Sequence, residues 1–195
     1  MSAPIHRIFG RPIDEPVPAG FEVVVFGMGC YWGVERLFWE IPGVYQTSVG
    51  FAGGSIPNPT YKQVCTYDTG HVEVVRIVYD PIRVSFDHLL KVFWENHNPT
   101  QGNRQGNDVG SQYRSVIFYT TEHQRAAAEA SRTDYNNRLA VEGFPEVTTE
   151  IAPLEAYYPA PEEDHQQYLD RYPNGYCGLR GTGVKAALPE GHEIS

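Results

Sequence analysis

The chain of 195 residues lacks any apolar run that approaches the roughly 20 residues of a membrane-spanning helix. It also lacks a secretory signal, because residues 1–20 contain four prolines and no apolar core segment. We therefore expect no membrane partner and read residues 1–20 as an extended N-terminal arm. With a methionine at position 1, the simplest expected location is the cytoplasm.

Basic residues are scarce as well, with 15 Lys and Arg against 24 Asp and Glu and a net charge of −9. An acidic surface repels phosphate backbones, so we expect no nucleic-acid partner.

Cysteine is the third scarce residue: the chain has three, Cys30, Cys65 and Cys177, with no C-x-x-C spacing. This count excludes a disulfide scaffold, and nothing in the spacing suggests a zinc site or another metal site. In a reducing cytosol, an isolated cysteine is either a buried structural thiol or a reactive one. For Cys65 we expect a buried structural thiol.

Apolar residues make up 41% of the chain, enough for the core of one domain over residues 1–195. We find no internal repeat and no linker. Strands alternate with helices, which indicates an α/β or α+β layered domain. Beyond residue 153 we expect an irregular tail to residue 195, with a short helix near 162–168. The predicted strands are 21–26, 44–52, 71–79, 115–119 and 147–151, and the predicted helices are 31–40, a helix capped by Ser85, and 121–140.

Cys30 lies where a strand ends and a helix begins, in the sequence GMGCYWG. A helix N-terminus offers free N–H groups and the positive end of the helix dipole, and both stabilise a thiolate. The flanking glycines let the backbone approach a ligand closely. This context favours Cys30 as a nucleophile. Tyr31 and Trp32 follow it, either as core residues or as an aromatic cage for a small apolar group beside the thiolate.

Glu73 lies within a strand whose two faces are both mostly apolar. Burial would raise its pKa and keep the carboxyl protonated, which suits a general acid next to a cysteine. The alternative is that Glu73 lies at the wet end of the strand. A long loop, residues 98–112, precedes Tyr113 and carries Asp108, and a loop of this length is typical of a functional segment.

Six blocks of the sequence resemble, in order, the A-type peptide methionine sulfoxide reductases. GCYWGVE is similar to the GCFWG-type signature of that family. The resemblance covers roughly residues 21–180 and implies a two-layer α/β sandwich, an α+β fold with a ferredoxin-like core and long irregular loops. The other blocks are NPTYKQVC, TGHVEVVRIVYDP, FWENHNPTQGNRQGNDVGSQYRS, EDHQQYL and NGYCG.

The resemblance implies roles for residues of this chain. Cys30 falls on the catalytic cysteine, Cys177 on the resolving cysteine, and Glu73 on the acid that protonates the sulfoxide oxygen. The residues implied to bind the substrate are Tyr31 and Trp32, which hold its methyl group, Tyr61 and Tyr113, which hydrogen-bond its oxygen, and Asp108, which orients the site.

The implied reaction reduces the S epimer of methionine sulfoxide, free or in proteins. Cys30 becomes a sulfenic acid, a Cys30–Cys177 disulfide follows, and thioredoxin restores the dithiol. No metal or organic cofactor is expected, and we expect a monomer.

Two departures from the family pattern matter. Position 31 is commonly Phe, and the Tyr31 hydroxyl needs water or a partner. Many members carry another cysteine shortly after GYCG, whereas this chain has none after Cys177. The simplest catalytic cycle therefore forms a direct Cys30–Cys177 disulfide, with a mobile C-terminal tail that brings Cys177 to Cys30. The glycines around Cys177 are Gly175, Gly178, Gly181 and Gly183.

Three other functions fit parts of the sequence. Cys30 and Arg36 have the C-x5-R spacing of a cysteine phosphatase, but Tyr31 and Trp32 would crowd a phosphate. A Cys–His hydrolase needs an essential histidine, and we expect His71, His97 and His165 to be structural or polar-network residues. The third alternative is a module that binds oxidised methionine without turning it over.

Overall fold

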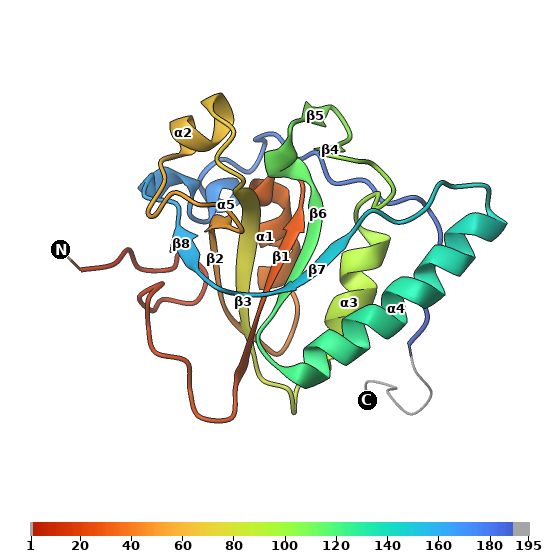
Figure 1. The fold of residues 1–195 in the computed structure, drawn as a ribbon. Coiled ribbons are helices and arrows are strands. Elements are labelled where there is room, and N and C mark those ends of the chain that lie inside the picture. Colours follow the sequence, from red (N-terminus) through yellow and green to blue (C-terminus); the bar gives the residue numbers. More distant parts are fainter. Residues whose placement is uncertain (1, 189–195) are drawn as a thin grey trace.

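The computed structural model describes residues 2–188, which fold around one six-stranded sheet (Figure 1). The strands of this sheet are β1 (Glu22–Met28), β2 (Val44–Ala52), β3 (Val72–Tyr79), β6 (Ser115–Tyr119), β7 (Glu150–Pro153) and β8 (Tyr157–Pro159). A separate pair comprises β4 (Arg104–Gln105) and β5 (Asp108–Val109). The helices are α1 (Tyr31–Trp39), α2 (Tyr61–Thr66), α3 (Phe86–Glu95), α4 (Glu122–Val141) and α5 (Tyr168–Arg171), with 3-10 turns η1 (Ser111–Tyr113) and η2 (Glu163–His165).

The central part of the sheet has ferredoxin-like topology. The chain runs β1-α1-β2-β3-α3-β6, and these strands lie in the order β6-β1-β3-β2 with every neighbouring pair antiparallel. The two outer strands extend this core. β7 pairs parallel to β6 after the α4 crossover, and β8 pairs antiparallel to β2. The predicted fold class is confirmed.

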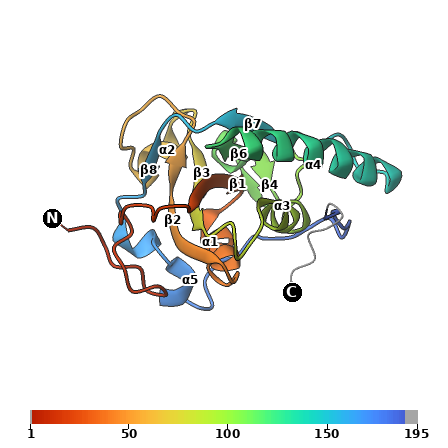
Figure 2. The same ribbon diagram turned by 90° about the horizontal axis from the view of Figure 1, so that it is seen from below.

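The helices α1 and α3 cover one face of the sheet, while the chain between β7 and β8 crosses the other face (Figures 1 and 2). The helical side holds the large core, in which Phe26 of β1 contacts Phe38 of α1 and Phe93 of α3. A smaller apolar cluster fills the opposite face, and Leu154 and Tyr157 of the crossing segment pack against it. The result is a two-layer sandwich.

The predicted segments agree with most of the structure. Strands were expected at 44–52 and 115–119, and β2 and β6 have these bounds. Ser85 and Thr121 cap α3 and α4, each accepting a hydrogen bond from the third residue of its helix. The expected helix at 162–168 is instead the turn η2 followed by α5. The described part of the predicted tail is otherwise mostly irregular, and residues 189–195 lie outside the described residues.

The N-terminal arm is irregular, as expected, but it is packed onto the domain rather than simply extended. His6 is fully buried, and its Nε2 lies 2.8 Å from Oγ1 of Thr47 on β2. The arm turns back on itself, since the His6 N–H donates to the Arg11 carbonyl. Arg7 adds a partly exposed ion pair with Asp170 at 2.6 Å. The arm therefore ties β2 to the C-terminal segment.

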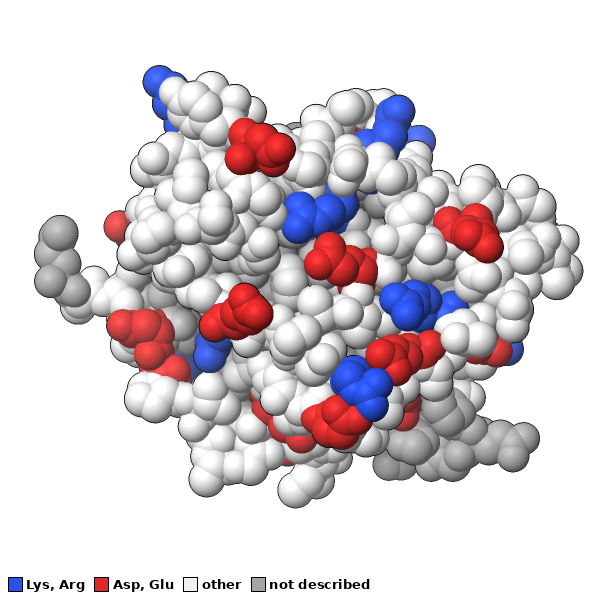
Figure 3. Space-filling model, viewed as in Figure 1, with Lys and Arg blue, Asp and Glu red and all other residues white. Residues whose placement is uncertain are grey.

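On the sheet face that carries the crossing segment, acidic and basic side chains are interspersed rather than gathered by sign (Figure 3). This face offers no basic stripe of the kind that tracks a phosphate backbone. Within residues 2–188, every helix is too short or too polar to cross a membrane.

Replacing Leu90 with Ala should destabilise the fold strongly, because Leu90 lies in the helical core with 1% of its surface exposed. Loss of its buried methyl groups costs about 2–5 kcal/mol of unfolding free energy. Ile82→Ala is the matched control, since Ile82 is 94% exposed and such surface changes stay within about 0.5 kcal/mol. Urea denaturation measures both variants, and equal losses would contradict this account of the core.

Candidate active site

Cys30 sits at the junction between β1 and α1, as its N-cap residue. The preceding Gly29 has a φ of +96°, a conformation that side-chain-bearing residues rarely adopt. A Cβ on Gly29 would also lie 2.7 Å from the Gln105 side chain. Gln105 in turn holds the long loop, exchanging hydrogen bonds with the Asn98 backbone at 2.9 and 2.8 Å. The glycine thus lets the 98–112 loop pack directly behind the thiol.

The pKa of Cys30 lies well above its usual range, chiefly because the thiol is buried. A negative charge on Glu73 raises the pKa further, and the Trp32 backbone N–H lowers it. The helix N-terminus therefore acts in the expected direction, but burial outweighs it. In the free protein Cys30 is a thiol, and the sequence expectation of a stabilised thiolate is not met without substrate.

Glu73 is buried in β3 with 1% exposure, which settles its position in favour of the strand interior. Its Oε1 accepts a hydrogen bond from the Tyr31 N–H at 3.3 Å, while Oε2 is buried and has no hydrogen-bond partner. Burial raises the Glu73 pKa to about 8, and Asp108 adds to the shift. The carboxyl is therefore mostly protonated at neutral pH and able to donate a proton beside Cys30.

Tyr31 and Trp32 lie in different surroundings. Tyr31 is fully buried, and its hydroxyl lies 2.8 Å from Nδ1 of His165, which supplies the partner that this hydroxyl needs. Trp32 is half-buried and stacks on Tyr168, with ring centroids 3.9 Å apart and planes 12° from parallel. His165 packs edge-on against Trp32 at 5.4 Å and against Tyr61 at 4.6 Å. The result is an aromatic wall beside the thiol.

The two tyrosine hydroxyls expected near the substrate oxygen lie close to Glu73. Ionised Glu73 raises the pKa values of both Tyr61 and Tyr113, after burial as the larger cause. Tyr61 opens α2, where its N–H donates to Glu162 at 3.0 Å. Both hydroxyls are therefore neutral donors at physiological pH.

Cys65 is exposed, so the expectation of a buried structural thiol is wrong. The reason is that α2 is a short helix on the surface whose buried residue is Val64. Burial of its sulfur is partial and raises the Cys65 pKa, while hydrogen bonding to Tyr61 and Tyr113 opposes that shift. Cys65 therefore lies at the rim of the site.

Asp108 lies near the site, and its side chain accepts a hydrogen bond from the C-terminal segment. The Tyr176 hydroxyl donates to Oδ2 of Asp108 at 2.8 Å. The Asp108 charge raises the pKa values of Cys30 and Glu73, which places it near both. Asp108 thus links the catalytic region to the residue that precedes Cys177.

Cys177 lies against α1, one helical turn from Cys30. A Cβ built on Gly33 would lie 2.6 Å from the Cys177 sulfur. Both cysteines are free thiols, and Cys177 contributes to the raised pKa of Cys30. The resolving candidate is thus already beside the nucleophile.

Sequence reasoning missed several residues of this site. His165, Tyr168, Glu162 and Tyr176 contact residues about 70 to 140 positions away, as the hydrogen bonds and ring contacts above show. The only signal was that these residues lie in or beside the blocks EDHQQYL and NGYCG.

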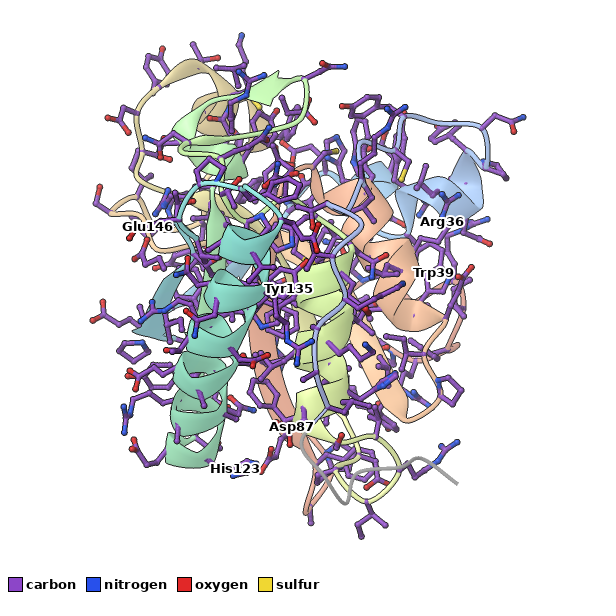
Figure 4. The ribbon with its side chains drawn as sticks, turned by 90° about the vertical axis from the view of Figure 1, so that its right-hand side faces the viewer. Arg36, Trp39, Asp87, His123, Tyr135 and Glu146 are labelled. Atoms are coloured by element: carbon purple, nitrogen blue, oxygen red, sulfur yellow. The ribbon has the colours of Figure 1, made fainter. Side chains whose placement is uncertain are left out.

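The alternatives to a reductase find little support. His71 and His97 are buried and hydrogen-bonded to backbone groups of Gly54, Ile56 and Phe93, and burial lowers the His97 pKa to about 4. The groups that shift the Cys30 pKa are Glu73, the Trp32 backbone N–H, Asp108 and Cys177, besides burial. Arg36 lies on α1 one turn before Trp39 (Figure 4) and is not one of these groups.

Within residues 2–188, no group of three or more His, Cys, Asp or Glu side chains is arranged to hold a metal ion. The groups that the structure gathers at this site are the Cys30 thiol, the Glu73 carboxyl and the Tyr61 and Tyr113 phenols. A partly buried thiol beside a protonated carboxyl, with a second, exposed thiol one helical turn away, defines a thiol-dependent oxidoreductase.

The sequence and fold comparisons agree with that class. The family model described as peptide methionine sulfoxide reductase matches residues 22–191. A relative named peptide methionine sulfoxide reductase MsrA, from Rhodospirillum centenum, is 62% identical over 96% of this chain and 85% of its own length. The solved methionine sulfoxide reductase A of Corynebacterium diphtheriae is 47% identical, covers 96% of this chain and 91% of its own, and superposes with a TM-score of 0.83. The chain belongs to the peptide methionine sulfoxide reductase family, which confirms the resemblance.

A more distant relative is Mxr1 from Saccharomyces cerevisiae. The structure of its reduced form is 30% identical to this chain and has a TM-score of 0.75. The alignment covers 84% of this chain and 92% of the Mxr1 chain. A structure of Mxr1 in complex with Trx2 aligns at 18% identity, with a TM-score of 0.54 and coverage of 89% and 94%, a likeness that shows the fold alone.

The raised pKa of Glu73 predicts a specific dependence of stability on pH. Between pH about 4.5 and about 8 the unfolded chain loses the Glu73 proton while the folded chain keeps it. The contribution of Glu73 to the free energy of unfolding is therefore fully present below pH about 4.5 and is lost as pH rises through about 8. Relative to Glu73→Gln, the wild type should lose on the order of a few kcal/mol between pH 5 and pH 9.

Denaturant titrations at both pH values test this prediction. Glu146→Gln is the control, because Glu146 is exposed and far along the chain from the site (Figure 4). A wild-type chain whose stability relative to Glu73→Gln does not change with pH would contradict the buried, protonated state of Glu73.

Proposed function

We propose that this chain reduces the S epimer of methionine sulfoxide to methionine, both free and within oxidised proteins, and so repairs oxidative damage. The observation that carries the proposal is the Glu73 carboxyl beside Cys30. It is buried, has a pKa of about 8, and leaves Oε2 without a hydrogen-bond partner. A sulfoxide oxygen is the acceptor that such a group lacks.

In the first step the Cys30 sulfur attacks the sulfoxide sulfur. Glu73 protonates the sulfoxide oxygen, with the Tyr61 and Tyr113 hydroxyls as further donors, and this makes the sulfur electrophilic. The hydroxyl is transferred from the substrate sulfur to the Cys30 sulfur as the substrate S–O bond and the transient bond between the two sulfurs break. Methionine leaves, Cys30 is left as a sulfenic acid, and Glu73 takes up the proton of the Cys30 thiol. The raised pKa of Cys30 does not block the reaction in this scheme. Glu73 gives its proton to the substrate oxygen and takes up the Cys30 proton within the same cycle.

The aromatic wall accounts for recognition of the methyl group. Trp32 is half-buried, and its ring is fixed by stacking on Tyr168 at 3.9 Å. An apolar methyl on this wall and an oxygen at Glu73 fix two substituents of the chiral sulfur, and attack by Cys30 fixes the face from which that sulfur is approached. Only one epimer satisfies all three, and family membership supports the S epimer.

In the second step the Cys177 thiol attacks the Cys30 sulfur. The Cys30 S–O bond breaks, water leaves with the Cys177 proton, and a disulfide forms. We propose that thioredoxin then reduces this disulfide by thiol exchange. Mxr1 in complex with Trx2, at the fold-level likeness described above, supports the choice of donor.

The cycle needs no metal or organic cofactor, since the electrons come from thiols. We propose that the chain works as a monomer in the cytoplasm, without nucleic-acid or membrane partners.

The reaction can be tested with mixed methionine sulfoxide epimers and dithiothreitol, followed by chiral chromatography. We expect loss of the S epimer only, and no loss with Cys30→Ser. Cys65→Ser is the matched control and should retain turnover, because Cys65 is exposed at the rim and has no role in the cycle. Consumption of the R epimer, or of neither epimer by folded wild type, would refute the proposal.

Glu73→Gln should slow methionine formation by about 10²–10⁴-fold, the usual contribution of a general acid. In the wild type the single-turnover rate should fall as pH rises above about 8, where Glu73 loses its proton. Stopped-flow or quenched-flow measurements from pH 6 to 10 test both statements. A rate that keeps rising through pH 9 would assign the protonation to another group.

A further inference from the structure

The Cys177 thiol lies in a notch on α1 that exists because residue 33 is glycine. Gly33 is the third residue of α1, and a Cβ there would lie 2.6 Å from the Cys177 sulfur and 3.4 Å from Cγ of Leu179. Real Cβ atoms do not approach other atoms to 2.6 Å. Any side chain at position 33 would therefore displace the Cys177 thiol.

Glycine is a costly choice within a helix, where it destabilises by roughly 1 kcal/mol relative to alanine. Gly33 has no positive φ that would require glycine for the backbone. The close approach of the Cys177 sulfur is what explains the residue. Residues three apart on a helix share a face, so the notch opens on the side of Cys30.

The C-terminal segment is docked at further glycines. A Cβ on Gly178 would lie 2.7 Å from the Tyr176 hydroxyl, and one on Gly175 would lie 2.9 Å from both Tyr168 and a backbone oxygen of Tyr172. A Cβ on Gly181 would overlap the Glu95 carbonyl at the end of α3. These glycines allow the C-terminal segment to pack closely against its neighbours.

Side-chain contacts hold the same segment on both sides of Cys177. Upstream, the Tyr176 hydroxyl donates to Asp108 at 2.8 Å. Downstream, the Tyr135 hydroxyl of α4 donates to the Val184 carbonyl at 2.9 Å (Figure 4). Hydrogen bonds thus hold the segment on both sides of the exposed Cys177.

We infer that Gly33 is a positioning residue for the second half of the reaction: it seats the Cys177 thiol on α1 before Cys30 is oxidised. When Cys30 becomes a sulfenic acid, Cys177 needs only a local movement to attack its sulfur. The Cys30 S–O bond then breaks, water leaves with the thiol proton, and the disulfide forms. This inference rests on the proposed function.

The kinetic test compares wild type with Gly33→Ala in a single turnover without reductant. We expect methionine to form at the wild-type rate, since contacts of Cys30 with Glu73 and the Trp32 N–H are untouched. A misplacement of about 1 Å can slow a reaction by up to about 10²-fold. We therefore expect disulfide formation, followed by mass spectrometry after acid quenching, to slow by at least about tenfold. The sulfenic acid should accumulate and be trapped by dimedone.

Gly102→Ala is the matched control, because a Cβ on Gly102 would meet nothing within 4 Å. Disulfide formation at the wild-type rate in Gly33→Ala would overturn the inference. An equal slowing of methionine formation would also overturn it, because Gly33 would then act through Cys30.

A stability cycle tests the same contact without any turnover, so it stands even if the proposed function fails. In a Cys177→Ala background, Gly33→Ala should raise the melting midpoint. Alanine favours the helix more than glycine does, and the new methyl group no longer clashes with the Cys177 sulfur. With Cys177 present the rise should be smaller or reversed. Equal shifts in the two backgrounds would show that the Cys177 sulfur does not occupy the notch.

Discussion

The buried carboxylate of Glu35 is the interaction on which the arrangement of the site depends. It is fully buried on α1 and accepts hydrogen bonds from the Gln167 N–H at 2.7 Å, the Gln167 side chain at 2.9 Å and the Thr47 hydroxyl at 2.7 Å. His6 completes the cluster, 3.5 Å away. One side chain therefore joins the arm, α1, β2 and the C-terminal segment, and an unsatisfied carboxylate there would be costly.

The cluster around Glu35 also determines where the aromatic wall lies. Gln167 has a left-handed backbone conformation, with a φ of +50°, and sits between His165 and Tyr168. Because its N–H and side chain are held by Glu35, the flanking rings are directed at Tyr31 and Trp32. Glu73 is also buried, but in contrast to Glu35 one of its carboxyl oxygens has no hydrogen-bond donor. The same residue type thus supports structure at one position and, in the proposed mechanism, donates a proton at another.

Much of this architecture was predictable from local pattern. Buried β-branched runs identified β1 and β3, and the amphipathic period with its Ser85 cap identified α3. β8 was not predictable, because Tyr157–Pro159 is a three-residue edge strand that ends in proline. The position of Cys30 at a strand–helix junction followed from its neighbours in the chain, whereas the neighbours of Glu73 left open whether it is buried or lies at the wet end of its strand. The environments of Cys65, His165 and Tyr176 did not follow from neighbouring residues, since they depend on contacts across long stretches of chain.

Trp32 stacks on Tyr168, and Tyr31 bonds to His165, so the surroundings of Cys30 are completed by residues more than 130 positions downstream. During synthesis, residue 30 leaves the ribosome well before residues 165–177, which supply the aromatic wall and the second thiol. Until that segment has folded onto α1, Cys30 lacks both the wall and the neighbouring Cys177 thiol on which the proposed reaction depends. Under the proposed function, the order of the chain therefore delays selective thiol chemistry at position 30 until the downstream segment has docked.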